Sequence, residues 1–288
     1  LQLCEKPEGA PGDELEAVEE GLAEIGLVSS LFDPGKLSAQ NVTYFTPFVS
    51  SDSTLVANWM DELQHTNADM KASWAANGLE YLGGAIGIDD YLLMTNFPIN
   101  SIADLEGKKI GAPGPAVNWL KGTGAVGVSG NLTTYYNEIK TGVYDGVIVF
   151  ASAAVPGKLY EVAPHITKIG FGAQYAGGLA ANKDWYDGLP ANVQTALKEA
   201  ATVNSKAYQQ DLDATVTKFL GIMEAQGATV NEVDQAFREQ WAAGMDNVAK
   251  DWADRLDSEG VAGTAVLKTY MDTMRAAGAT PVRNWDQE

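Results

Sequence analysis

The stretch PANVQTALKEAATVNSKAYQQDLDATVTKFLGIM, residues 190–223, says most about the fold class of this 288-residue chain. Pro190 suits the first turn of a helix, because the N–H that proline lacks would have no partner there. Apolar or small side chains then recur at helical spacing: Val193, Leu197, Ala201, Tyr208, Leu212, Val216, Phe219 and Met223. An average helix has about 11 residues, so an unbroken helix over residues 190–226 should reach beyond a single lobe.

Short alternating strands and helices precede this long helix and predict an α/β fold. Strands are expected at LQLC (1–4), IGLVSS (25–30), YLGGAIG (81–87), YLLMT (91–95), KKIGA (108–112), AVGVS (125–129), YDGVIVF (144–150), ITKIGF (166–171) and YAGGLAAN (175–182). One helix is expected to begin at Asp13, with Leu15, Val18, Leu22 and Ile25 on one face. Further helices are expected over residues 52–65, 116–122, 132–142, 233–258 and 263–276.

Composition excludes several classes of function. The chain carries 38 acidic and 19 basic residues, for a net charge of −19, which excludes a nucleic-acid-binding face. Its single cysteine, Cys4, allows no internal disulfide, which is compatible with the cytoplasm or a bacterial periplasm. No apolar run reaches the ~18 residues needed to cross a bilayer, so the chain is not expected to be membrane-embedded.

Motifs for catalysis or cofactor binding are weak. Gly122, Gly124 and Gly127 form G-x-G-x-x-G, but the expected order is helix, glycines, strand, whereas a dinucleotide site needs a strand before and a helix after them. Gly122 is better interpreted as the left-handed end of a helix. His65 and His165 have no metal-ligand spacing, and GVSGN at 127–131 is not a nucleophile elbow. We therefore expect no catalytic residue, no metal and no cofactor.

Four junctions between strands, turns and helices occur in a characteristic order: PINSIADLEGKKI (98–110), YYNEIKTGVYDGVI (135–148), KLYEVAPHIT (158–167) and ANKDWYDGLPANVQTALKEAA (181–201). In this order they resemble the DctP-type solute-binding proteins of tripartite ATP-independent periplasmic (TRAP) transporters, over nearly the whole chain. The resemblance implies a monomeric periplasmic protein that binds a small molecule and delivers it to a TRAP permease.

The resemblance also implies a two-lobe periplasmic-binding-protein fold. Lobe 1 would comprise residues 1–96 with part of 180–288, lobe 2 would comprise 97–179 with part of 190–288, and helix 190–226 would span both. Ligand would close the lobes about pivots near residues 94–98 and 179–182. Family members open with a strand and helix of about forty residues that this sequence lacks; we expect the sequence to be incomplete, since their loss would expose a sheet edge.

The ligand site implied by the resemblance departs from the family pattern. The family has an arginine that grips the ligand carboxylate, and Gly111 occupies the matching position here. A second ligand-facing position falls on Val149, beside Phe150. We expect the missing arginine to leave room for a bulkier, more apolar or aromatic ligand than the usual C4-dicarboxylates, against Trp119 and Phe150.

Further candidate ligand contacts are aromatic and amide side chains: Phe32, Tyr91, Trp119, Asn131, Tyr175 and Asn182. Several of these could equally be core residues. Lys36 or Lys121 could still supply a point positive charge for a monocarboxylate. A soluble ligand sensor on the same scaffold is the first alternative, and an α/β enzyme is the lower-ranked one.

Overall fold

The computed structural model describes residues 12–288, and its strands form two separate sheets. The predicted strand at residues 1–4, with Cys4, lies outside the described residues. The three-stranded sheet, order β1-β8-β2, consists of antiparallel strands β1 (Ile25–Val28), β8 (Gln174–Asn182) and β2 (Leu79–Ile88). The mixed six-stranded sheet has the order β5 (Val126–Ser129), β4 (Lys109–Ala112), β6 (Gly146–Phe150), β3 (Tyr91–Thr95), β7 (His165–Lys168) and β9 (Thr229–Glu232).

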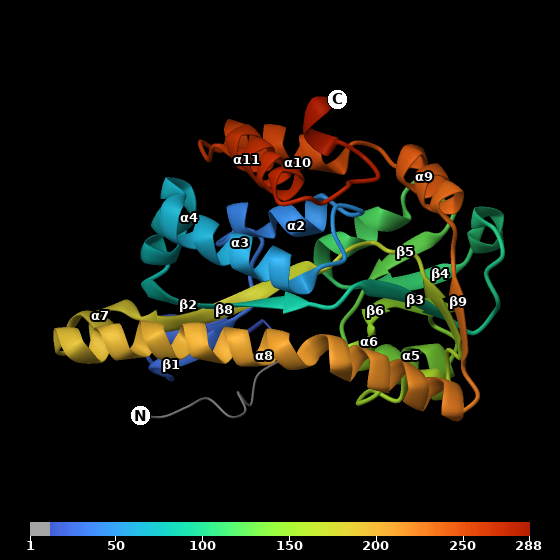
Figure 1. Ribbon diagram of the computed structural model, residues 1–288, viewed down its shortest axis with the longest axis horizontal. Coiled ribbons are helices and arrows are strands. Elements are labelled where there is room, and N and C mark those ends of the chain that lie inside the picture. Colours follow the sequence, from blue (N-terminus) through green and yellow to red (C-terminus); the bar gives the residue numbers. More distant parts are fainter. Residues whose placement is uncertain (1–11) are drawn as a thin grey trace.

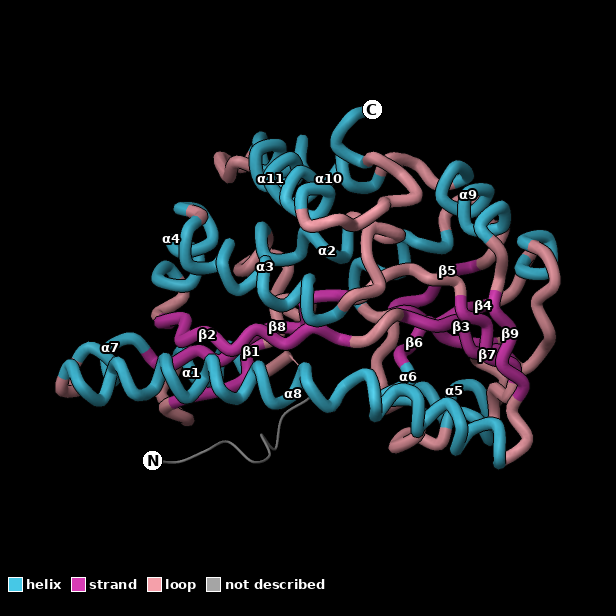
Figure 2. The backbone as a smooth tube through the Cα atoms, viewed as in Figure 1, coloured by secondary structure: helices cyan, strands magenta, loops and turns pink. Residues whose placement is uncertain are grey.

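The two sheets are the centres of two lobes, seen as two groups of strands in Figure 2. Lobe 1 is built on the three-stranded sheet and carries α1 (Glu14–Glu19), α2 (Val42–Phe45), α3 (Ser53–Thr66), α4 (Ala68–Ala76) and α7 (Lys183–Asp187). Lobe 2 is built on the six-stranded sheet and carries α5 (Tyr135–Lys140), α6 (Ala151–Ala154) and the 3-10 helix η3 (Gly114–Leu120). The expected two-lobe α/β fold is confirmed.

Helix α8 (Ala191–Ala225, 35 residues) confirms the long helix expected over residues 190–226. It runs beneath both lobes in Figure 1, packing on β2 in lobe 1 and on α6 and β9 in lobe 2. The helix approaches β2 closely: a Cβ atom on Gly84 (φ +74°) would lie 2.8 Å from the carbonyl oxygen of Ala201. Ser205 Oγ donates to the Ala85 carbonyl (2.6 Å), so the glycine pair in LGGAIG serves helix–sheet contact.

The chain passes between the sheets at two other places, residues 89–90 between β2 and β3, and residues 169–173 between β7 and β8. Asp90 joins them, because one of its carboxylate oxygens accepts a hydrogen bond from the Gly172 N–H (2.7 Å). The other accepts from Ser51 Oγ (2.8 Å). The lobe boundaries expected from the sequence, 96/97 and 179/180, lie just after β3 and within β8, several residues beyond these two crossings.

The C-terminal helices cover lobe 1 and reach across to lobe 2. Helices α10 (Val248–Ser258) and α11 (Gly263–Ala276) pack on each other and on α2, while α9 (Gln235–Gly244) lies over lobe 2 (Figure 1). Trp241 on α9 donates its Nε1–H to the Trp119 carbonyl oxygen (2.7 Å). Both tryptophans are buried in the largest core of the described residues, which fixes the C-terminal helices to both lobes.

Several local predictions need correction. The helix expected over residues 233–258 is two helices, because the chain breaks after Gly244 and Asn247 caps α10 through a hydrogen bond from the Lys250 N–H (2.9 Å). Residues 116–120 of the helix expected over 116–122 belong to the 3-10 helix η3, and α1 ends at Glu19, which leaves Leu22 exposed. Strand β9 and helix α4 were not expected. Gly122 does have the left-handed conformation expected of it (φ +78°).

Candidate functional site

A cavity of about 180 Å³ opens where the two lobes meet, and we call it the inter-lobe cavity. Lobe 1 supplies the loop after β1, one tyrosine of α2 and the end of β2, and lobe 2 supplies β3, β6 and the chain after β4 and β5. Its lining residues are Ser29, Leu31, Phe32, Tyr44, Ile88, Tyr91, Pro113, Asn131, Leu132, Tyr135, Ile148, Val149 and Phe150. The carboxyl ends of β1, β4, β5 and β6 all point to this place, which is the usual position of ligand sites in open α/β sheets.

Three tyrosines line this cavity: Tyr44, Tyr91 and Tyr135. The hydroxyls of Tyr44 and Tyr91 form a hydrogen bond with each other (3.1 Å), and the buried hydroxyl of Tyr135 has no partner among the described residues. Burial raises the pKa of all three tyrosines far above neutral pH, so each hydroxyl is protonated. No charged side chain lines the cavity within residues 12–288, so its hydrogen bonding is that of neutral groups.

The aromatic rings of the cavity are held in fixed positions by their neighbours. Phe150 meets Tyr91 edge to face, with ring centroids 5.2 Å apart. Trp119 lies behind them, stacked on Tyr44 (6.0 Å) and edge-on to Tyr91 (5.3 Å). The Nε1–H of Trp119 donates to the Tyr44 carbonyl oxygen (2.7 Å). The cavity wall is therefore an ordered aromatic surface on which a planar ligand could pack.

The structure brings together five of the nine candidate ligand residues. Phe32, Tyr91, Asn131, Val149 and Phe150 all line the inter-lobe cavity, although Phe32 comes from lobe 1 and the others from lobe 2. The Asn131 Oδ1 accepts a hydrogen bond from the Thr133 N–H (3.0 Å). No hydrogen bond to the Asn131 amide nitrogen is found among residues 12–288, so its N–H groups can serve a ligand.

The other four candidates lie outside the cavity lining. Trp119 supports the lining rings from behind, and Tyr175 on β8 is fully buried. Asn182 caps α7 by accepting from the Trp185 N–H (3.0 Å), and its amide donates to the Val18 carbonyl oxygen (3.0 Å). Gly111 on β4 is buried, and a Cβ atom there would point at Tyr144, 2.8 Å from ring atom Cε2.

Sequence reasoning missed eight lining residues. They are Ser29, Leu31, Tyr44, Ile88, Pro113, Leu132, Tyr135 and Ile148. One signal was available: Pro113 and Leu132 follow expected strands and Ser29 lies at the end of one, and residues at the ends of strands of an α/β sheet gather at one edge. Tyr44 and Tyr135 carried no such signal, because both lie on short helices.

The two lysines considered as point charges are engaged or placed elsewhere. The ammonium of Lys36 forms ion pairs with Glu19 (2.9 Å) and Glu16 (3.5 Å). Lys121 lies at a different concavity, beside Asp251 and Arg255. Neither lysine lines the inter-lobe cavity, and nor does any of the four arginines.

Asp33, next to the cavity residue Phe32, gives a testable dependence of stability on pH. Burial raises the pKa of Asp33 to about 6, opposed by Lys36 and supported by three glutamates of α1. Because the folded-state pKa lies above the unfolded value of 3.8, the folded state holds the proton more tightly. The contribution of Asp33 to the free energy of unfolding is therefore fully present at pH values below the unfolded-state pKa, and it is lost as the pH rises through about 6.

We therefore expect Asp33→Asn to flatten the fall in unfolding free energy between pH 4 and about 6. Urea unfolding at several pH values, with NMR titration of the Asp33 carboxyl, measures this. The exposed Asp213→Asn serves as the control and should keep the wild-type slope. An Asp33 that titrates near 3.8 would contradict the prediction.

Comparison with known proteins identifies the family. Residues 8–255 match the family model of DctP, bacterial extracellular solute-binding protein family 7. The chain belongs to this family. Its relatives include the ectoine/5-hydroxyectoine-binding periplasmic protein UehA of Ruegeria pomeroyi, 27% identical over 90% of this chain and 76% of UehA. The C4-dicarboxylate-binding periplasmic protein DctP of Rhodobacter capsulatus is 26% identical over 87% of this chain and 75% of that protein.

Solved structures of TRAP solute-binding proteins share the fold. The ectoine-binding protein TeaA of Halomonas elongata superposes with a TM-score of 0.80 at 21% identity, covering 91% of this chain and 84% of TeaA. A protein from Rhodoferax ferrireducens, in complex with benzoate, superposes with a TM-score of 0.81 at 17% identity, covering 93% of this chain and 84% of that protein. Through its family the chain is a bacterial extracellular solute-binding protein, and the relatives UehA and DctP are periplasmic binding proteins. No helix within residues 12–288 has the length and apolarity required to cross a membrane.

Proposed function

We propose that this family 7 protein binds a small organic molecule with an apolar or aromatic body in the inter-lobe cavity and delivers it to a TRAP permease. The observation that carries the proposal is the lining itself: aromatic and aliphatic side chains, three tyrosine hydroxyls and no charge among residues 12–288. Such a lining gains most from burying an apolar surface, at about 25 cal/mol per Å². The hydroxyls then orient one or two polar groups of the ligand.

A small dicarboxylate fits this lining poorly. Moving a carboxylate out of water costs several kcal/mol unless a cation or several donors replace its hydration. Neutral donors are present, but each neutral hydrogen bond contributes only about 0.5–1.5 kcal/mol. The ligands in the names of UehA and of the benzoate-bound structure show that this family accepts molecules other than C4-dicarboxylates. Both facts support a non-dicarboxylate ligand for this chain.

We also propose that ligand closes the two lobes about residues 89–90 and 169–173, with α8 as the third connection. The pivots suggested by the sequence are held by strand pairing at Met94, which pairs with Val147 and Ile166, and at Leu179, which pairs with Leu27. Backbone pairing on both sides resists the change of dihedral angles that a hinge requires. The two crossings lie between strands and are tied together by the Asp90–Gly172 hydrogen bond, so they can bend as a unit.

A ligand sensor without a permease remains the alternative function, and the family membership fits both. Genes for a small and a large membrane subunit beside this gene favour the transporter. We further propose that the chain has no catalytic activity, since members of its family are transport proteins. Purified protein should therefore release every ligand unchanged.

The proposal is tested by a thermal-shift screen with aromatic and aliphatic compounds, neutral and acidic. A true ligand at a hundredfold excess over its Kd adds about 2.7 kcal/mol to the free energy of unfolding, and it should raise the Tm by roughly 5 °C. X-ray scattering with and without that ligand should show a smaller radius of gyration in the complex. A screen with no hit among apolar compounds, or identical scattering curves with saturating ligand, would contradict the proposal.

A matched pair of variants locates the binding. Tyr135→Phe removes the unpartnered hydroxyl and should weaken a ligand that bears a polar group by about threefold to tenfold. Its neighbour Tyr136 donates instead to Glu161 (2.8 Å), outside the cavity. Tyr136→Phe should therefore leave the affinity unchanged. Equal losses in both variants would place the ligand elsewhere.

A further inference from the structure

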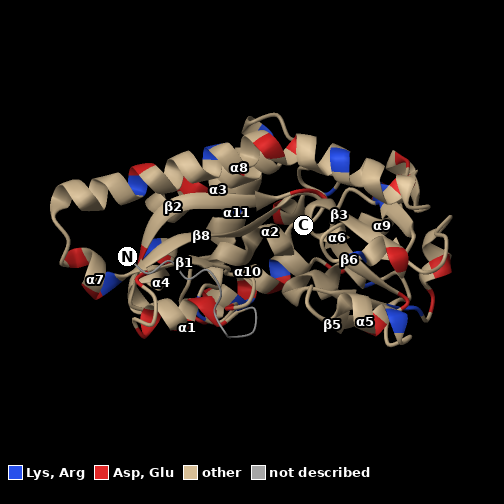
Figure 3. Ribbon diagram, turned by 90° about the horizontal axis from the view of Figure 1, so that it is seen from below, with Lys and Arg blue, Asp and Glu red and all other residues tan. Residues whose placement is uncertain are grey.

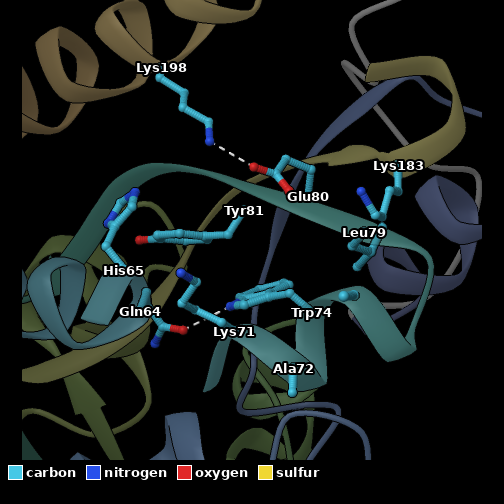
Figure 4. Close-up of a pocket in the computed structure, with 11 residues that line it drawn as sticks. Gln64, His65, Lys71, Ala72, Trp74, Leu79, Glu80, Tyr81, Lys183 and Lys198 are labelled. Carbon is cyan, nitrogen blue, oxygen red and sulfur yellow. Dashed lines mark hydrogen bonds and ion pairs between the residues drawn. The ribbon is translucent and has the colours of Figure 1, made fainter. Parts of the chain in front are cut away.

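A second cavity, of about 430 Å³, lies in lobe 1 and shares no residue with the inter-lobe cavity. Helices α3 and α4 form one side, the beginning of β2 crosses it, and single lysines reach it from α7 and α8 (Figure 4). Its lining residues are Gln64, His65, Lys71, Ala72, Trp74, Ala75, Leu79, Glu80, Tyr81, Lys183 and Lys198. We call it the basic pocket.

The charge of the basic pocket is opposite to that of the chain. Among residues 12–288, three lysines line it and Glu80 is the only acidic residue that does. Elsewhere acidic side chains are spread over helices of both lobes (Figure 3). With His65 neutral, the lining carries three positive charges and one negative charge, a net charge of +2. Asp187 and Asp61 also contact the lining, at Lys183 and Tyr81, and offset part of this charge.

The lysines of the pocket differ in how they are engaged. Lys198 pairs with Glu80 (2.7 Å), and Lys183 pairs with Asp187 (2.8 Å), which is outside the lining. The side-chain ammonium of Lys71 forms no hydrogen bond or ion pair with any residue in the described part of the chain. Its ammonium therefore carries three donors that an incoming anion can take without breaking an existing pair.

Rigid aromatic side chains form the wall of the pocket. Trp74 stacks on Tyr81 with ring centroids 5.2 Å apart, and His65 lies 5.2 Å from Tyr81 on another side (Figure 4). Gln64 Oε1 accepts from the Trp74 Nε1–H (2.8 Å), while the buried Gln64 Nε2 has no acceptor among residues 12–288. The wall thus holds an unsatisfied amide donor, and a buried donor without a partner is costly.

We propose that the basic pocket is a second ligand site, for a small organic anion carrying two or more carboxylates. Three lysines supply the charge, the unpaired Lys71 supplies the first contact, and the aromatic wall accepts the carbon skeleton of the anion. Asp61 accepts a hydrogen bond from the Tyr81 hydroxyl (2.7 Å) and Asp187 pairs with Lys183 (2.8 Å), so both carboxylates reduce the attraction although neither lines the pocket. The site is independent of the ligand in the inter-lobe cavity.

Calorimetric titration with citrate at low ionic strength is the test, with Lys71→Gln as the informative variant. We expect saturable binding with a Kd below about 1 mM, weakened about tenfold in Lys71→Gln and weakened again by added salt. Lys218→Gln is the control, because Lys218 is exposed on the far end of α8 and has no partner in the described part of the chain. It should bind citrate like the wild type.

Two further arms separate the alternatives. Tyr135→Phe should leave citrate binding unchanged, and a loss there would move the citrate site to the inter-lobe cavity. A tetraglutamate peptide that binds when citrate does not would overturn the small-anion site in favour of an acidic segment of a partner protein. Absence of citrate binding, or an equal loss in Lys71→Gln and Lys218→Gln, would also overturn the proposal.

Discussion

Gly111→Arg is expected to lower the free energy of unfolding by about 3 kcal/mol or more, instead of restoring an arginine clamp. Position 111 lies on β4, the second strand of the six-stranded sheet, and is paired with Val128 on β5 and Val147 on β6. A Cβ atom there would sit 2.8 and 2.9 Å from two ring atoms of Tyr144 and 3.2 Å from Val147. Overpacking of this kind costs about 1–3 kcal/mol, and the buried guanidinium adds the cost of a charge without a partner.

Two alanine variants separate packing from charge. Gly111→Ala adds only the clashing methyl group, so it should destabilise by about 1–3 kcal/mol. Gly221→Ala adds the same methyl group to α8, where no atom lies within 4 Å, and should stabilise by roughly 0.5–1 kcal/mol. Urea unfolding of the three variants measures these differences. A Gly111→Arg protein as stable as the wild type would show that Tyr144 moves aside easily.

The position of Tyr144 also corrects the expectation that the missing arginine leaves room for a ligand. The Tyr144 ring already fills the space in front of Gly111, and its side chain belongs to the core of lobe 2. Any extra space for a bulky ligand must therefore come from elsewhere in the lining. A sequence shows that an arginine is absent, but it does not show which neighbouring side chain has taken its place.

Elements marked by a long apolar stripe or by an apolar run could be predicted from the sequence, and a break inside a continuous helical pattern could not. The 35-residue α8 follows one apolar stripe, and its start at Pro190 is a local signal. Strands β3 and β6 are short apolar runs bounded by turns, and they lie where they were expected. By contrast, the division of residues 233–258 at Asn247 depends on packing of α9 and α10 against different lobes, which leaves no trace in periodicity.

The candidate site was predictable only where the chain order fixed the position. Val149, Phe150 and Asn131 follow or end strands that meet at one edge, and all three line the cavity. Tyr175 and Asn182 were chosen for their chemical type on or after a strand, and the face that a strand residue presents depends on its register. Tyr44 and Tyr135 come from one-turn and two-turn helices whose orientation only tertiary packing decides.

Succinate and malate are expected to bind the inter-lobe cavity at least two to three orders of magnitude more weakly than a matched apolar ligand. Without a charge-assisted pair to its buried carboxylate, such an acid loses about 3–5 kcal/mol of binding free energy. Calorimetry in the Lys71→Gln background removes any contribution of the basic pocket to the measured heat. Lys36→Ala and Lys121→Ala should change nothing, because neither lysine lines the cavity. Micromolar binding of either acid in these proteins would contradict the expectation.

The sharpest comparison uses two ligands of one shape, benzoate and benzamide, which differ chiefly in charge. In the wild-type cavity the amide should bind more tightly, because the tyrosine hydroxyls and Asn131 can satisfy a neutral group but cannot compensate a full charge. Asn131→Lys places a cation on the cavity lining and should reverse the preference by about tenfold or more. Asn118→Lys, on η3 and away from the lining, adds the same charge as a control. A preference for benzoate in the wild type would contradict the expectation. The pair of ligands therefore tests whether the absence of charge, and not merely the shape of the cavity, selects the ligand.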